Sequence, residues 1–248
     1  MQEIELAKKN LIIKGITGSR LYGTETGESD IDYVGVFIPP QEYIYGLKRC
    51  EQVIVKEKNE NGVLEEYTCY SLDKYIRLAI ANNPNIISLL FTPTDRLVYV
   101  NDFGLELLEN KSLFLSKKAY HSFRGYAHAQ RRKITSKEQV LGHRKDLIEK
   151  YGYDVKFAMH LLRLLYEGLD ILVGKELVYP CPMRTLFSDI RQGKKTLEWI
   201  LDEADRLEKL ITEQYSKSDL QYSADQVAIE KLQMGMFERC WDEQRRLK

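Results

Sequence analysis

Apolar positions in the first 70 residues occur in short runs that predict β-strands. The run at 32–38, DYVGVFI, is rich in β-branched and aromatic residues and stops at Pro39, which cannot continue a sheet interior. Two further runs, at 51–58 and 63–70, flank the sequence NENG, so we expect a hairpin turn at Asn61-Gly62. With the earlier run NLIIKGI at 10–16, these segments are predicted to form a sheet.

Helical spacing of apolar residues takes over after Ser71, which is the expected N-cap of a helix over 71–81. Another helix is predicted at 83–91, with a proline in its first turn. Beyond residue 116 the pattern predicts helices alone, the longest at 155–174 and 196–214. The acids and bases of 196–214 are interpreted as a solvated face.

The two kinds of pattern predict an α+β protein. We expect an N-terminal mixed or antiparallel sheet with helices on one face, followed by an α-helical domain. The change of pattern falls between residues 110 and 120, so the expected domains are 1–115 and 116–248. With no Gly/Ser linker between them, the two parts are expected to pack together and leave a cleft.

Composition narrows the class of protein. The 248 residues include 37 basic and 37 acidic side chains, so any anion-binding surface must be local. The four cysteines form no C-x-x-C pair, which argues against a zinc site or a disulfide framework. No apolar run approaches the roughly 18 residues of a membrane span, and the charged N-terminus does not resemble a signal peptide. We therefore expect a cytoplasmic protein with no membrane partner.

Asp30 and Asp32 are separated by one isoleucine at the start of the strand predicted at 32–38. Residues i and i+2 of a strand point to the same side, so both carboxylates are expected on one side. Two carboxylates this close repel each other unless a cation lies between them. Mg²⁺ takes such oxygen ligands together with substrate phosphates, and Mn²⁺ suits the same oxygen set. The pair therefore predicts a divalent metal site; the alternative is two acids on a surface turn.

Gly18 and Ser19 follow the first predicted strand. A glycine there lets the backbone approach a phosphate, which N–H groups and the serine hydroxyl can hold, and Arg20 can pair with phosphate oxygens. A two-metal site for phosphoryl transfer would use a third carboxylate. Glu65 and Glu66 are the candidates, and because they point to opposite sides of a strand, alternation alone does not choose between them.

Lys156, His160 and Arg163 follow the spacing i, i+4, i+7 within the long helix predicted at 155–174, which places them on one face. This stripe suits a triphosphate or an RNA phosphate facing the sheet. A solvated helix face is the alternative interpretation.

Residues 117–145 hold five lysines and four arginines against one acid. Tyrosines, a phenylalanine and histidines are interleaved with them, a composition found in proteins that bind single-stranded nucleic acid. The alternative is an amphipathic helix whose basic residues are merely solvated. The candidates for nucleic-acid contact are Arg124, Arg131, Arg132, Lys133 and, from the later helix, Arg163.

Four segments carry a resemblance to a known family: GSRLYG at 18–23, SDIDYVGVFIP at 29–39, YSLDKYIRLAIANNPNIISLLF at 70–91, and YGYDVKFAMHLLRLLYEGLDILVGKELVYP at 151–180. The first two resemble the h-G-[GS] turn and the D-h-[DE]-h strand of the nucleotidyltransferase superfamily that includes DNA polymerase β. Together the four are similar to the RNA-ligase-associated predicted nucleotidyltransferases, the RlaP family, over most of the chain from about residue 11 to about 195.

The resemblance implies roles for individual residues. It makes the N-terminal part a nucleotidyltransferase palm in which Gly18 and Ser19 hold the triphosphate and Asp30 and Asp32 bind two Mg²⁺ ions. It favours Glu66 as the third acid, although a glutamate stands where the family's aspartate is commoner, and Glu65 remains the fallback. It also favours Lys156 and His160 as nucleotide-binding residues.

The function implied is Mg²⁺-dependent transfer of a nucleoside monophosphate from a nucleoside triphosphate, such as ATP, to a hydroxyl. RNA is the favoured acceptor, either a tRNA or an RNA 3′ end in repair or modification. One alternative is nucleotidylation of a protein side chain or a small molecule. Another is a nucleotide- or RNA-binding protein without turnover.

Overall fold

The computed structural model describes residues 2–26, 29–58, 64–135 and 143–246. Within these ranges, five strands form one mixed sheet in the order β3-β4-β2-β1-β5. The central neighbours β2 and β4 run parallel, and every other neighbouring pair is antiparallel. The strands are β1 (Leu11–Thr17), β2 (Asp32–Phe37), β3 (Gln52–Lys58), β4 (Leu64–Ser71) and β5 (Leu97–Val100).

The remaining described elements are helical. The α-helices are α1 (Gln2–Lys9), α2 (Gly18–Tyr22), α3 (Leu72–Ile80), α4 (Pro84–Ile87), α5 (Asp102–Glu109), α6 (Lys118–Thr135), α7 (His143–Tyr151), α8 (Val155–Gly174), α9 (Arg184–Arg191), α10 (Leu197–Lys217) and α11 (Gln226–Arg246). Short 3₁₀ segments are η1 (Gln41–Tyr43), η2 (Ser88–Phe91), η3 (Thr94–Arg96) and η4 (Lys111–Phe114).

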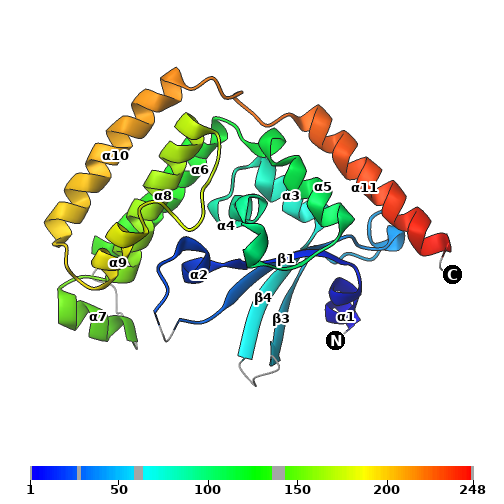
Figure 1. Ribbon diagram of the computed structural model, residues 1–248, viewed down its shortest axis with the longest axis horizontal. Helices are drawn as coiled ribbons and strands as arrows, with labels where there is room; N and C mark the ends of the chain where they lie inside the picture. Colours follow the sequence, from blue (N-terminus) through cyan, green and yellow to red (C-terminus); the bar gives the residue numbers. More distant parts are fainter. Residues whose placement is uncertain (1, 27–28, 59–63, 136–142, 247–248) are drawn as a thin grey trace.

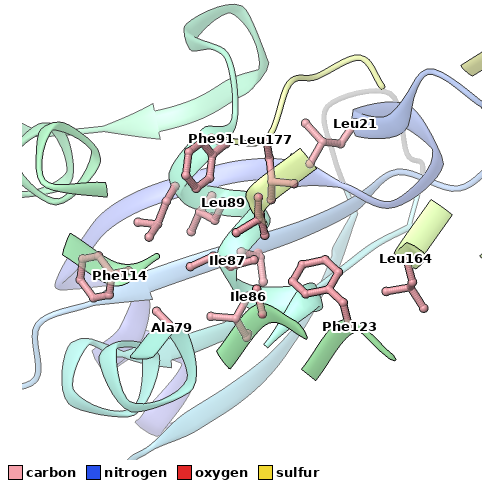
Figure 2. Packing of buried hydrophobic residues seen from close by; sticks show 14 of the residues in the cluster. Leu21, Ala79, Ile86, Ile87, Leu89, Phe91, Phe114, Phe123, Leu164 and Leu177 are labelled. Atoms are coloured by element: carbon pink, nitrogen blue, oxygen red, sulfur yellow. The ribbon is translucent and has the colours of Figure 1, made fainter. Parts of the chain in front are cut away.

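Helices α3, α4 and α5 lie over one face of the sheet, and α6 and α8 lie beside α4 near the α2 end; one large apolar core runs through these helices (Figure 1). Figure 2 shows Ile86 and Ile87 of α4 at the centre of this core, with Phe123 of α6 close by. Helices α6 and α8 pack along each other, and Gly168 lets them approach closely. A Cβ at Gly168 would lie 3.0 Å from Cβ of Phe123. This packing fixes α6 and α8 relative to each other.

The opposite face of the sheet is covered in part by α1, over a smaller core that includes Phe37, Val55 and Cys69. Lys14 of β1 is buried there with only 8% of its surface exposed. Its ammonium lies 4.3 Å from the ring centre of Tyr33 and 4.1 Å from that of Tyr67. Cation–π attraction offsets part of the cost of burying this charge.

The C-terminal helix α11 returns to the N-terminal part of the chain. Nε1 of Trp241 donates a hydrogen bond to the carbonyl oxygen of Pro39 at 2.9 Å, and Arg239 pairs with Glu106 at 2.5 Å. One continuous apolar cluster includes both Ile13 and Trp241. The division into domains 1–115 and 116–248 remains a sequence-based prediction.

Most elements expected from the sequence pattern are confirmed, including the strands at both sides of the predicted hairpin; the turn at Asn61-Gly62 lies outside the described residues. The segment 83–91 divides into α4 and η2, and the hydroxyl of Ser71 does not cap α3. It donates instead to the carbonyl oxygen of Glu51 at 3.1 Å. Strand β5 was not predicted. None of the described helices combines the length and the apolar composition needed to cross a membrane.

Candidate functional site

The junction of β1 and α2 brings the backbone into contact with a carboxylate. Thr17, the last residue of β1, pairs with Asp32, the first residue of β2. Gly18 follows with φ of +66°, a conformation that L side chains rarely adopt. A Cβ at this position would lie 2.3 Å from Oδ2 of Asp32. Glycine is therefore required at residue 18 both by the turn and by the approach of the carboxylate.

Asp30 and Asp32 are both exposed and both line one cavity of ≈ 880 Å³ above the sheet. Asp32 begins β2, whereas Asp30 lies just before the strand. Gly18 lines the same cavity. The three residues that the sequence motifs singled out thus line one cavity. The alternation of a strand explains the direction of Asp32 alone, because Asp30 lies before the strand begins.

For the third predicted carboxylate, Glu66, the structure gives the position of the backbone and not of the side chain. In the parallel pairing of β2 with β4, Glu66 is the register partner of Asp32, and Thr68 is that of Val34. Thr17, Asp32 and Glu66 therefore occupy one row across three strands. The side chains of Glu65 and Glu66 lie outside the part of the structure that is described, so Glu66 stays a prediction.

Helices α6 and α8 provide the opposite wall of the cavity. Tyr126, Gln130 and Lys133 line it from α6, and His160, Arg163 and Leu164 line it from α8. Nζ of Lys133 lies 5.2 Å from the ring centre of Phe157 on α8. The cavity therefore has carboxylates on the sheet side and cationic or titratable groups on the helix side.

Arg163 is the most buried of these groups, at 3% exposure. Its Nη1 lies 2.5 Å from Oε2 of Glu167, one turn along α8, and its guanidinium lies 4.0 Å from the ring centre of Tyr22 on α2. Burial by itself lowers the pKa of Arg163, but the Glu167 carboxylate raises it, and the net direction is upward. Arg163 is therefore a fixed positive charge at the cavity wall.

Glu167 joins α8 to the segment that follows it. Its Oε1 accepts a hydrogen bond from the hydroxyl of Tyr179 at 3.2 Å, and Sγ of Cys181 lies 3.7 Å away. Burial raises the pKa of both the Tyr179 hydroxyl and the Cys181 thiol, so both are neutral donors at neutral pH. Sequence reasoning missed Glu167, although its spacing of four residues from Arg163 within an apolar run was a visible signal.

Several predicted residues lie outside the lining of this cavity. Ser19 and Arg20 belong to α2, and Nη2 of Arg20 donates to the carbonyl oxygen of Ser29 at 3.0 Å, beside Asp30. Lys156 is exposed in the first turn of α8. Arg20 thus supports the loop that precedes the acids, and Lys156 does not line the cavity with His160 and Arg163.

The other basic candidates line a second groove of ≈ 690 Å³ on the opposite side of α6. Arg131 pairs with Asp205 of α10 at 2.5 Å, and Nη2 of Arg124 lies 3.8 Å from Glu208. The hydrogen bond from Arg131 lowers the pKa of Asp205. The charges of α10 therefore pair with α6 in addition to being solvated. The groove is lined by His121, Arg124, Gly125, His128, Arg131, Arg132 and Leu201.

A divalent ion could take its protein ligands from Asp30 and Asp32. Among the described residues, no group of three His, Cys, Asp or Glu side chains gathers in a way that could hold a metal. Two carboxylates still fit Mg²⁺, which completes its octahedron with water and substrate phosphates.

Comparison with known proteins adds to this geometry. The chain is 28% identical over 145 residues to the uncharacterized 38.9 kDa protein in nrdC-mobD intergenic region of Enterobacteria phage T4, which covers 56% of this chain and 43% of that protein. This chain thus matches less than half the length of that relative. A nucleotidyltransferase-like protein from Exiguobacterium sibiricum 255-15 aligns over 86% of this chain and 72% of that protein's chain, at 13% identity and a TM-score of 0.33.

A family model matches residues 1–237, which is nearly the whole chain. Its description is RlaP, the RNA repair pathway DNA polymerase beta family. The match includes both the Gly18 turn and the two aspartates. The chain therefore belongs to the RlaP family, a nucleotidyltransferase-like family of the polymerase β type.

Proposed function

We propose that this protein transfers a nucleoside monophosphate from a nucleoside triphosphate to a hydroxyl of RNA, with Mg²⁺ as cofactor. One observation carries the proposal. Asp30 and Asp32 line a single cavity with Gly18, and Lys133, His160 and Arg163 line the same cavity from the helices. This arrangement of acids and bases matches a metal-bound triphosphate better than it matches a neutral ligand.

The carboxylates of Asp30 and Asp32 would hold the divalent ions, with Glu66 as the candidate for a third ligand. When bound, the ions would neutralise the phosphates and lower the pKa of the attacking hydroxyl. Mn²⁺ would be accepted by the same oxygen ligands.

The protein's own groups would position the triphosphate. The turn at Gly18 lets phosphate oxygens approach the backbone, and its N–H groups can donate to them. Arg163 keeps its positive charge because Glu167 pairs with it, and its buried Nε has no hydrogen-bond partner among the described residues. Catalysis of this kind rests mainly on positioning and charge neutralisation.

RNA is proposed as the acceptor because the family is described as part of an RNA repair pathway and because the chain is basic around α6. Lys133 lines the catalytic cavity, whereas Arg132 lines the groove on the other side of the helix. Lys133 is exposed and lines the cavity of the two aspartates, so Lys133→Glu is expected to reduce transfer more than Arg132→Glu.

The test is a label-transfer assay with each α-³²P-labelled triphosphate in turn. The protein and Mg²⁺ are incubated with total RNA and, separately, with a cell protein extract. Asp30→Asn/Asp32→Asn removes the proposed metal ligands, and Asp202→Asn, an exposed aspartate on α10 outside the cavity, is the matched control. Label on RNA in the wild type and the control, but not in the double variant, is expected.

Other outcomes would change the proposal. Label on protein would replace RNA by a protein side chain as the acceptor. Transfer that persists in the double variant would refute the site assignment. Nucleotide binding with no transfer to either extract would contradict the proposal and favour a binding protein.

A further inference from the structure

The catalytic cavity has two chemically different ends. Asp32 lies at the charged end, next to Gly18 and Asp30. In the β2–β4 register, Asp32 pairs with Glu66, so Tyr70 lies four residues farther along β4. At about 3.3 Å per residue this is about 13 Å from the row of Asp32. Tyr70 and its uncharged neighbours in the lining, Thr68 on β4, Asn85 on α4, and Tyr126 and Gln130 on α6, define what we call the uncharged end.

Tyr126 is an aromatic ring held in place by its hydroxyl. It projects from α6 with 37% of its surface exposed, and Nδ2 of Asn83 donates to its hydroxyl at 2.9 Å. Asn83 is in turn fixed, because its Oδ1 accepts from the backbone N–H of Asn85 at 3.0 Å as the N-cap of α4. A rigid, partly exposed ring at a cavity wall loses little conformational entropy when a planar ligand stacks on it.

Tyr70 of β4 lines the same cavity as Tyr126. Burial raises the pKa of Tyr70, and the nearby Tyr126 hydroxyl adds to the effect. Tyr70 is half-buried, so its ring is anchored in the sheet while it still lines the cavity. Two tyrosines from different elements, β4 and α6, therefore line this part of the cavity.

Two amides flank these rings. Gln130 lies one turn after Tyr126 on α6, and Asn85 lies in the first turn of α4. Each side chain carries an N–H₂ donor and a carbonyl acceptor. Neither has a side-chain hydrogen bond within the described ranges, although both line the cavity. Free amides beside aromatic rings can read the donors and acceptors on the edge of a flat heterocycle.

We propose that the uncharged end of the cavity binds the nucleobase of the triphosphate, with Tyr126 as the stacking surface and Asn85 and Gln130 as the groups that distinguish bases. This proposal rests on the proposed function, because the charged end is then the triphosphate subsite. The distance between the two ends suits a molecule whose base and phosphates are separated by a ribose. A cavity of ≈ 880 Å³ is large enough for it.

The experiment compares the binding of nucleoside triphosphates with that of inorganic tripolyphosphate, both with Mg²⁺ and without an acceptor. Tyr126→Ala is expected to weaken triphosphate binding about tenfold, in line with the loss of one base-stacking contact, and to leave tripolyphosphate binding unchanged. The matched control is Tyr99→Ala, which removes a tyrosine that is 45% exposed on β5, outside the cavity. Equal losses for the two ligands, or no loss for either, would overturn the stacking role.

Base discrimination is tested with Asn85→Asp and Gln130→Glu, which change donors to acceptors at nearly constant shape. At least one of them is expected to change the relative affinities for ATP, GTP, CTP and UTP about tenfold. An unchanged order in both variants would refute the assignment of the amides. Tripolyphosphate binding, together with the melting temperature, shows that each variant is folded.

Failure of this proposal can be told apart from failure of the proposed function. If triphosphate binding depends on Tyr126 but no acceptor is ever labelled, the base subsite stands and the transferase activity does not. If transfer occurs and Tyr126→Ala has no effect on triphosphate affinity, only the base subsite is overturned. A wild-type protein that binds no triphosphate would overturn both.

Discussion

The buried ion pair on α8 gives a prediction of stability that can be worked from the structure. Arg163 and Glu167 are one helical turn apart, and each side chain is only 4% exposed. Lys217 and Glu213 of α10 have the same i, i+4 spacing, but their side chains are 67% and 60% exposed and their charged atoms are 4.0 Å apart. The two pairs share the i, i+4 spacing and differ in burial and in the distance between their charged atoms, so Glu213→Gln serves as the exposed control for Glu167→Gln.

The expected magnitudes follow from that difference. Glu167→Gln would leave the Arg163 guanidinium buried without its counter-charge, and removing one partner of a buried pair costs about 3–5 kcal/mol of unfolding free energy. The change also weakens the acceptors for Tyr179 and Cys181, which adds to the cost. Glu213→Gln is expected to change the unfolding free energy by about 0.5 kcal/mol or less, because water screens an exposed pair.

The assay is urea unfolding of the wild type, Glu167→Gln and Glu213→Gln, followed by circular dichroism. In a thermal scan of a chain of this size, a loss of about 3–5 kcal/mol corresponds to a decrease in melting temperature of roughly 6–20 °C. The double variant Arg163→Met/Glu167→Leu should recover part of the loss seen in Glu167→Gln, because it removes both buried charges. Equal effects of Glu167→Gln and Glu213→Gln would refute the conclusion that this pair is desolvated.

Three further predictions concern the turn, the groove and the metal. Gly18→Ala should abolish nucleotide transfer, because the added Cβ would lie 2.3 Å from Oδ2 of Asp32. The control Gly125→Ala adds a Cβ that would have no atom within 4 Å; it should leave transfer intact and raise the unfolding free energy by up to about 1 kcal/mol. Comparable transfer by the two variants would contradict the turn geometry. Arg131→Ala should change the unfolding free energy by about 1 kcal/mol or less, since its partner Asp205 is 52% exposed. A clearly larger loss in urea unfolding would contradict this prediction. EDTA should stop transfer and added Mg²⁺ should restore it; label transfer that continues in EDTA would exclude the proposed cofactor.

Local signals in the sequence predicted much of the fold and the centre of the cavity. The strand at 32–38 and the long helix at 155–174 follow from short-range periodicity, and Gly18 with Asp30 and Asp32 follows from a turn beside a strand. Long-range placement could not be derived in this way. Nothing near Trp241 indicates that α11 packs against Pro39, and the short strand β5 exists because it pairs with β1.

The helix α6 shows why residue types alone left the basic segment ambiguous. Its sequence has one apolar stripe, which includes Phe123 in the core, and the rest is polar. If α6 were an amphipathic helix with one buried face, all of its polar residues would be solvated. In the structure the polar residues divide between two cavities: Lys133 lies in the wall of the cavity that Asp30 and Asp32 line, while Arg132 lies in the groove beside α10. The helical spacing already places Lys133 and Arg132 on different faces of α6. Which face borders the sheet and which borders α10 depends on tertiary packing, which the sequence pattern does not reveal. Substitutions on the two sides of α6 are therefore expected to separate catalysis from packing.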